Sequence, residues 1–208
     1  MTVLLSIYQW IFIIAVPIIV LIVAFFLIIL PIRRRSIRRN YDEYYYKTIR
    51  RIVTDEDYYL INRFIFKIDD TKTGTIDHII FGEKYFYLIT SKYYDGDIIG
   101  KQFDKSLILI DSRGKKSYID NPYLESKLLL ERLSLNTEVD ASLMIGIVVT
   151  NKRVNINVTN ESKQLYAIQI NKLPKLIKAI EARPIPTINE QQLARAVKVF
   201  DKLNRRRD

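Results

Sequence analysis

Apolar residues are distributed in two ways along the chain, and the change separates an N-terminal segment from the remainder. From Val3 to Ile32 the chain is an almost unbroken run of large apolar residues, and residues 1–32 contain no charged side chain. This run exceeds the roughly 20 residues that a helix needs to cross the hydrocarbon of a bilayer. Arginine follows it directly and no charge precedes it, unlike a cleaved signal peptide. The pattern predicts a retained transmembrane anchor at residues 1–32.

A basic linker is predicted at residues 33–40. Its five arginines are Arg33, Arg34, Arg35, Arg38 and Arg39. By the positive-inside rule, they place the N-terminus outside and the C-terminal domain in the cytoplasm, in a single-pass protein of the cell membrane. We expect the arginines to contact anionic lipid at the membrane surface. A nucleic-acid patch is the alternative interpretation of the same cluster.

Beyond the linker, helical and strand periodicities alternate, which predicts an α/β domain at residues 41–183. Helices are predicted at 41–53, from Asn121-Pro122 to Leu133, and at 172–182. Strands are predicted at 58–68, 75–81, 85–92, 106–110, 143–150, 156–158 and 165–170. The short link at 82–84 predicts an antiparallel hairpin. The continuous apolar run at 143–150 is typical of a strand buried on both faces.

Residues 184–208 are predicted to form a separate amphipathic helix. Pro184 and Pro186 divide it from the preceding domain, and Thr187 and Glu190 have the spacing of a capping box. Its apolar face is expected to dock on the domain's own surface, and the alternatives are a helix that binds a protein partner or one that lies on the membrane surface.

The composition narrows the chemistry that is open to this domain. The formal net charge is +10, and half of that excess lies in the arginine cluster. The absence of cysteine excludes disulfides, thiolate metal sites and cysteine nucleophiles, and a single histidine excludes a multi-histidine metal site. The sequence also lacks the glycine-rich phosphate loops and the EF-hand pattern. Carboxylates, Lys, Arg and hydroxyl groups remain as candidate functional groups.

The segment from Gly74 to Gly96 holds the arrangement that carries the chemical interpretation. Asp77 lies in one predicted strand, and Thr90 and Lys92 lie in the next, after the hairpin. Because side chains two residues apart point to one face of a strand, Thr90 and Lys92 are expected to lie side by side.

This arrangement resembles the PD-(D/E)XK nuclease superfamily, and in particular the NERD (nuclease-related) domain. The motifs concerned are Ile76-Asp77-His78-Ile79-Ile80, Ile89-Thr90-Ser91-Lys92, Tyr94-Asp95-Gly96 and Asn121-Pro122. The resemblance covers about residues 41–155, with Glu125 where the family has Gln, and Asp42 and Glu43 as acidic residues of a preceding helix. It implies an α/β, restriction-endonuclease-like fold, with a mixed β-sheet flanked by helices.

The resemblance also implies a metal site. In such nucleases two carboxylates hold Mg²⁺, which activates water, and a neighbouring Lys polarises the water and balances phosphate charge. Asp77 is accordingly the expected metal ligand, with Lys92 as its catalytic partner. Thr90 stands where the second carboxylate is expected, and its hydroxyl supplies no charge. The carboxylates that could replace it are those of Glu43, Asp95, Glu83 and Asp97.

Two functions of different class follow. The first is a degenerate nuclease module that binds nucleic acid or protein at the cytoplasmic membrane face without catalysis, and the neutral Thr90 favours it. The alternative is an active Mg²⁺-dependent DNA or RNA nuclease with a relocated carboxylate, which the presence of Asp77 and Lys92 favours. A scaffold that keeps only the fold is the third interpretation. His78 is expected to pack or hydrogen-bond on the face opposite Asp77.

Overall fold

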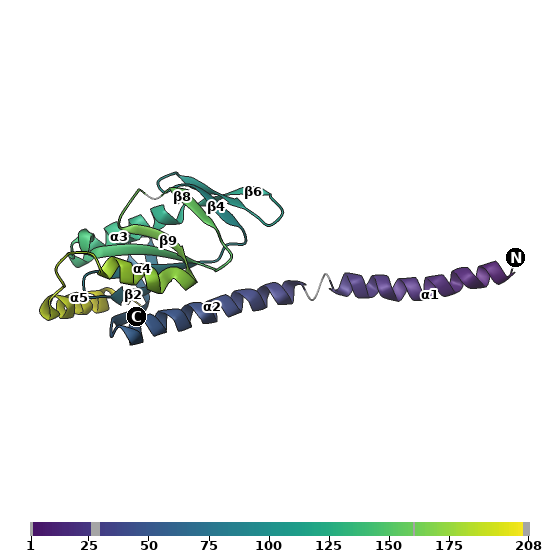
Figure 1. Cartoon of the computed structure of the whole chain (residues 1–208), viewed down its shortest axis with the longest axis horizontal. Coiled ribbons are helices and arrows are strands. Elements are labelled where there is room, and N and C mark those ends of the chain that lie inside the picture. Colours follow the sequence, from purple (N-terminus) through teal and green to yellow (C-terminus); the bar gives the residue numbers. More distant parts are fainter. Residues whose placement is uncertain (1, 26–29, 160, 206–208) are drawn as a thin grey trace. The chain divides into compact units, whose positions relative to one another are not determined.

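The computed structural model describes residues 2–25, 30–159 and 161–205, and the side chains of residues 13–25 and 40–205 within these ranges. The helices are α1 (Thr2–Ala24), α2 (Leu30–Asp55), α3 (Pro122–Thr137), α4 (Leu173–Glu181) and α5 (Glu190–Leu203), with short 3-10 helices η2 (Ala141–Leu143) and η3 (Ile170–Lys172). The strands are β1 (Tyr59–Lys67), β2 (Thr73–Phe81), β3 (Phe86–Lys92), β4 (Asp97–Lys101), β5 (Ser106–Ile110), β6 (Lys116–Asp120), β7 (Met144–Thr150), β8 (Ile156–Thr159) and β9 (Leu165–Gln169). The order of the elements is drawn in Figure 1.

The chain divides into two units, Met1–Tyr45 and Tyr46–Asp208. In the first unit, α2 starts well before the helix predicted at 41–53 and includes the segment expected as a linker. Arginine is a good helix former, and residues 33–40 contain no Gly or Pro to end the helix. The side chains of the five arginines lie outside the described residues, as does part of the predicted anchor. Within the described part of the chain, no helix is both long and apolar enough to cross a membrane.

A five-stranded mixed sheet with the order β1-β2-β3-β7-β9 forms the centre of the second unit. The pairs β1–β2 and β2–β3 are antiparallel, and the pairs β3–β7 and β7–β9 are parallel. The hairpin predicted between β2 and β3 is confirmed, with Phe81 opposite Phe86. The apolar run at 143–150 forms β7, which is buried along its whole length and lies between β3 and β9. The predicted mixed α/β class is therefore confirmed.

A second sheet with the order β6-β5-β4-β8 was only partly anticipated from the sequence. Strands β4 and β6 were missed because both are only five residues long and have charged residues at both ends, and β6 is an exposed edge strand. One face of this sheet faces the core through Ile98 and Leu107, and the chain enters it directly after β3.

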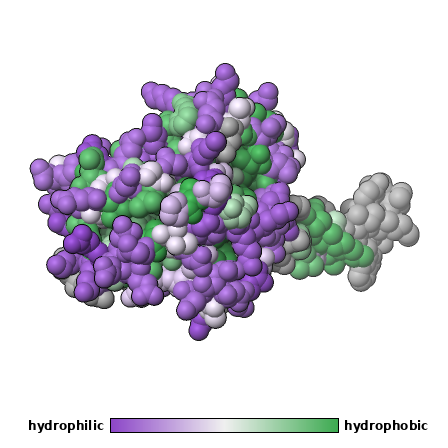
Figure 2. All heavy atoms as spheres, turned by 60° about the vertical axis from the view of Figure 1, so that its left-hand side comes forward, coloured by the Kyte–Doolittle hydropathy of each residue, from purple (hydrophilic) through white to green (hydrophobic). Residues whose placement is uncertain are grey.

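The core lies between the first sheet and the helices α3 and α5. It includes Phe86 and Leu88 of β3, Leu133 of α3 and Phe200 of α5, all nearly inaccessible to solvent. The Phe200 ring lies 5.2 Å from that of Phe81, at an interplanar angle of 78°. The apolar face of α5 is thus covered by the chain's own core, as the sequence led us to expect. Hydrophilic side chains dominate the face shown in Figure 2.

The N-terminus of α5 differs from the prediction. The capping residue is Asn189 and not Thr187: its side chain accepts the backbone N–H of Gln192, while the Gln192 side chain accepts the N–H of Asn189. Asn is a strong N-cap, and Gln three residues later completes a capping box as well as Glu does. The helix consequently begins at Glu190.

Helix α3 approaches β7 closely where β7 has a glycine. A Cβ atom at Gly146 would lie 2.4 Å from the Ser126 hydroxyl and 3.0 Å from a Leu165 methyl carbon. Glycine is therefore required by the short distance between helix and sheet, and this contact fixes the height of α3 above β3 and β7.

We expect Gly146→Ala to lower the free energy of unfolding by about 1–3 kcal/mol, because overpacking displaces helix or strand. The double variant Gly146→Ala/Ser126→Ala should recover part of that loss, since it removes the nearer of the two clashing atoms. Urea denaturation followed by circular dichroism measures both. Equal stability of the wild type and Gly146→Ala would show that α3 is not held at this height.

Candidate functional site

Asp77 lies at an irregular point of the β1–β2 pair. Ile76 and Ile79 both contact the same core, so the alternation of inward and outward side chains breaks between them. On β1, Arg63 has a left-handed backbone with φ of 54°, and it falls between the register pairs formed by Asn62 and Phe64. A non-glycine residue in this region carries a conformational cost, and such residues cluster at functional sites.

The Asp77 carboxylate is half-buried and is held by the neighbouring strand. Its Oδ2 accepts the backbone N–H of Ser91 at 2.6 Å. Burial raises the pKa of this carboxyl, while the Ser91 hydrogen bond and the charges of Lys92 and Arg63 lower it in part. Glu125 raises the same pKa by repulsion between carboxylates, so a second carboxylate acts electrostatically on Asp77.

That second carboxylate also binds the predicted lysine. The Lys92 Nζ lies 2.7 Å from Glu125 Oε2 and 3.0 Å from Oε1. The side chains of Lys92 and Glu125 are 36% and 49% exposed, so the pair is reached by solvent. Thr90, two residues before Lys92, is only 8% exposed. The structure thus places the buried hydroxyl of Thr90 where a carboxylate was expected. The carboxylate that contacts Lys92 comes instead from Glu125.

Glu125 was missed as a site residue, although the sequence places it in the first turn of a helix after Asn121-Pro122. Asn121 caps α3: its Oδ1 accepts the Tyr123 N–H at 2.9 Å, and Pro122 occupies the start of the helix. The Asn121 amide also donates to the carbonyls of Gln102 and Asp104, at 2.9 and 2.6 Å. The sequence did show that Glu125 is a carboxylate in the first turn of a helix. The sheet topology is needed to show which strand this helix turn faces.

The four carboxylates proposed to replace Thr90 lie in different parts of the chain. Glu83 is exposed in the hairpin at the other end of β3, roughly 20 Å from Lys92 along the strand. Asp97 accepts the backbone and side-chain N–H groups of Asn155, at 3.1 and 3.3 Å. Asp95 is exposed between β3 and β4, and Glu43 belongs to the other unit.

The donor set does not suit Mg²⁺ in the arrangement described. Over the residues whose side chains are described, no group of three or more His, Cys, Asp or Glu is placed to hold a metal ion. Asp77 has one oxygen engaged by Ser91, Glu125 is engaged by Lys92, and Thr90 is neutral. Two carboxylates would be available to a metal only if Glu125 left the lysine.

His78 has the structural environment that the sequence predicted. It is buried, its Nδ1 lies 2.8 Å from the Asn62 Oδ1, and its ring meets the edge of Tyr46 at 5.4 Å. Burial lowers the pKa of His78 to about 4, so the ring is neutral at physiological pH. These contacts pack a helix against the sheet.

The ion pair of the candidate site is open to solvent. A groove of about 830 Å³ lies between β1 and α5, lined by Tyr59, Leu193 and Val197 among others, and its lining includes neither Asp77 nor Lys92. An exposed ion pair beside a half-buried carboxylate is accessible to a polymer, whereas a small ligand prefers a concave apolar pocket.

The fold and these residues define a nuclease-related module, a mixed α/β domain with Asp on one strand and Lys on the next. The family model described as "Nuclease-related domain" (NERD) matches residues 42–151, so the chain belongs to the NERD family. No curated protein matches the chain. A crystal structure of a protein of unknown function, AF1548, aligns with 77% of this chain and 96% of that chain, at 10% identity and a TM-score of 0.35. That similarity is too low to bear on function.

Asp77→Asn is expected to raise the free energy of unfolding at pH 8 and to leave it unchanged at pH 3. Because burial raises the pKa of Asp77, its ionised form destabilises the folded state. This cost is absent below the ordinary carboxyl pKa and complete above the raised value. The asparagine amide oxygen can still accept the Ser91 N–H. Urea denaturation at both pH values measures the difference, and a less stable variant at pH 8 would contradict the assignment.

Proposed function

We propose that the chain is a degenerate nuclease module that binds the phosphate backbone of nucleic acid without hydrolysing it. The observation that carries this proposal is the pairing of Lys92 with Glu125 beside a buried, neutral Thr90. A nuclease of the related type needs two carboxylates free to hold a metal and a lysine free to act on water. Here Thr90 stands in place of one of these carboxylates, and a further carboxylate, that of Glu125, neutralises the lysine.

The ion pair of Lys92 and Glu125 is suited to weak binding of phosphate. Since both partners are exposed, the ion pair is weak, worth about 0–1 kcal/mol, and an incoming phosphate can compete with Glu125 for the ammonium of Lys92. When it is ionised, the Asp77 carboxylate repels phosphate near this point, which limits the affinity of the site. Modest affinity that falls with salt is expected of such a site.

The second candidate function is an active Mg²⁺-dependent nuclease with Glu125 as the relocated carboxylate. The electrostatic effect of Glu125 on Asp77 supports it, because it brings two carboxylates and a lysine to one site. In this case Glu125 would have to release Lys92 when the metal binds.

Glu125→Gln moves the two candidates in opposite directions. For the binding module, loss of the carboxylate frees Lys92 and removes repulsion of about 1 kcal/mol, so an oligonucleotide should bind about fivefold tighter. For the nuclease, the same change should abolish cleavage of plasmid or RNA in Mg²⁺ or Mn²⁺. Fluorescence anisotropy and gel assays measure the two effects on one preparation.

Glu131→Gln is the matched control. Glu131 lies on the same helix and pairs with Lys127 at 3.7 Å. Its substitution therefore removes the same negative charge at a position away from Lys92. Metal-dependent cleavage by the wild type that is lost in Asp77→Ala and in Glu125→Gln, but kept in Glu131→Gln, would refute the binding module and establish the nuclease.

We further propose that residues 1–32 attach this module to the cytoplasmic face of the cell membrane, with the N-terminus outside. The apolar sequence of residues 1–32 and the five arginines after it support this orientation. Protease added to intact spheroplasts is expected to leave the folded domain undigested until the membrane is permeabilised. Digestion of the domain in sealed spheroplasts would refute the orientation.

A further inference from the structure

The outer face of the second sheet carries a row of exposed and half-buried residues that the site described above does not use. The register aligns Tyr118 of β6 with Ile108 of β5, Ile99 of β4 and Asn157 of β8. Tyr118 is 80% exposed and Ile99 is 37% exposed. The alternate residues point into the core, so this row is the solvent side of the sheet. A nearly uncovered aromatic ring on a flat strand surface has the geometry for stacking on a planar ring.

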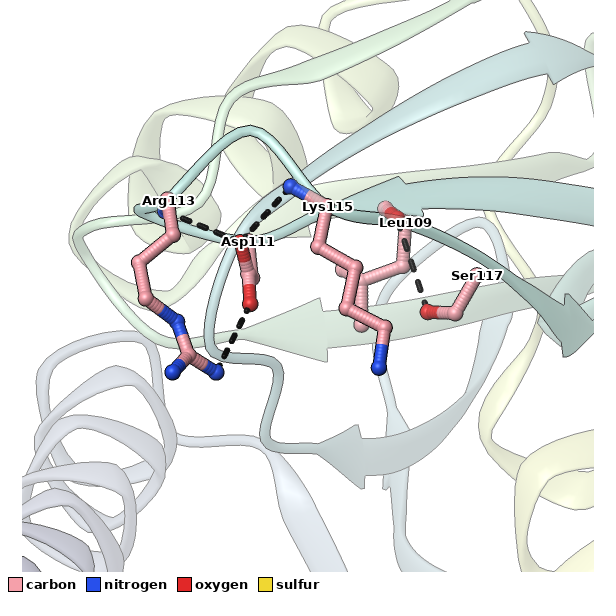
Figure 3. Close-up of polar contacts among 5 residues, drawn as sticks. All are labelled: Leu109, Asp111, Arg113, Lys115 and Ser117. Atoms are coloured by element: carbon pink, nitrogen blue, oxygen red, sulfur yellow. Dashed lines mark hydrogen bonds and ion pairs between the residues drawn. The ribbon is translucent and has the colours of Figure 1, made fainter.

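Cations gather at the turn that joins β5 to β6. Arg113, Lys115 and Lys116 lie within six residues whose only carboxylate is that of Asp111. Figure 3 shows Asp111 accepting the backbone N–H groups of Arg113 and Lys115, both at 2.9 Å, and one guanidinium nitrogen of Arg113 at 3.4 Å. These bonds shape the turn and lower the pKa of Asp111, so its carboxylate stays ionised. Three cations against one anion leave the turn positively charged.

The turn also lies beside the chain that leaves the candidate site. A Cβ atom at Gly96 would lie 2.8 Å from the Ile110 carbonyl carbon and 3.0 Å from the Asp111 Cα, so the two backbones are in contact there. Gly96 follows Lys92 by four residues, which span at most about 14 Å. The backbone of the cationic turn therefore contacts the segment that follows Lys92.

From this placement we propose that the outer face of the second sheet binds single-stranded nucleic acid, with a base stacked on Tyr118 and phosphates on Lys115 and Lys116. The inference rests on the proposed function and specifies that the bound nucleic acid is single-stranded. A stacking ring beside cations fits an unpaired base, because the bases of a duplex are already stacked on one another. The charge of the turn complements the phosphate backbone.

The test measures binding of a fluorescein-labelled 16-nucleotide oligothymidylate and of the matching duplex to the full chain in detergent, by fluorescence anisotropy at several salt concentrations. Tyr118→Ala should weaken single-strand binding by about 5- to 150-fold, whereas Tyr118→Phe should stay within about twofold of the wild type. In Lys115→Ala/Lys116→Ala the logarithm of the binding constant should fall less steeply with the logarithm of the salt concentration. The magnitude of the slope should decrease by about 1.4, which corresponds to two phosphate contacts. The single strand should bind more tightly than the duplex.

Matched controls are Leu135→Ala, which truncates an apolar side chain 71% exposed on α3, and Lys198→Ala/Lys202→Ala, which removes two exposed lysines from α5. Both should bind as the wild type does. If the Tyr118 and lysine variants also bind as the wild type does, while Glu125→Gln still tightens binding, this inference fails and the proposed function stands. If the full chain binds neither oligonucleotide, both fail.

Anionic lipid is the competing source of phosphate. Vesicles of phosphatidylcholine with phosphatidylserine are therefore tested with the same variants. Vesicle binding that depends on Lys115 and Lys116, together with oligonucleotide binding that does not, would overturn the inference and assign this face to a membrane surface.

Discussion

The amide of Asn121 is the interaction on which the arrangement of the second unit depends. This side chain is only 4% exposed, and it makes three hydrogen bonds, one to the start of α3 and two to the turn after β4. A buried amide is costly unless it is satisfied, so its partners are held firmly. The same amide therefore sets the position of the second sheet and the start of the helix that carries Glu125.

Local patterns predicted much of the fold, because the forces that determine those elements act over a few residues. The β2–β3 hairpin follows from two apolar runs and a short link, and the start of α3 follows from Asn121-Pro122. The first residue of α2 and the N-cap of α5 were predicted wrongly. Arginine suits a helix as well as a linker, and both Thr187 and Asn189 are residue types that can cap a helix. Strands β4 and β6 were missed because their stability comes from pairing in a sheet and not from their own composition.

The candidate site was predictable only in part, for a different reason. Asp77 and Lys92 are close in sequence and joined by a hairpin, so their proximity follows from strand geometry. Glu125 is 33 residues from Lys92, and only the parallel pairing of β3 with β7 and the tight contact of α3 at Gly146 bring it there. The sequence can show that a charge is missing at Thr90, but not which distant residue restores it.

The second sheet is built mostly from one stretch of chain, which leaves the first sheet after Lys92 and rejoins the fold at Asn121. Both ends of this stretch are fastened: the Tyr94 N–H to the Asn151 side chain, and Asn121 to the turn after β4. Within this stretch β5 still adds Leu107 to the core, so the part that can change without disturbing buried side chains is the exposed turn at residues 112–115.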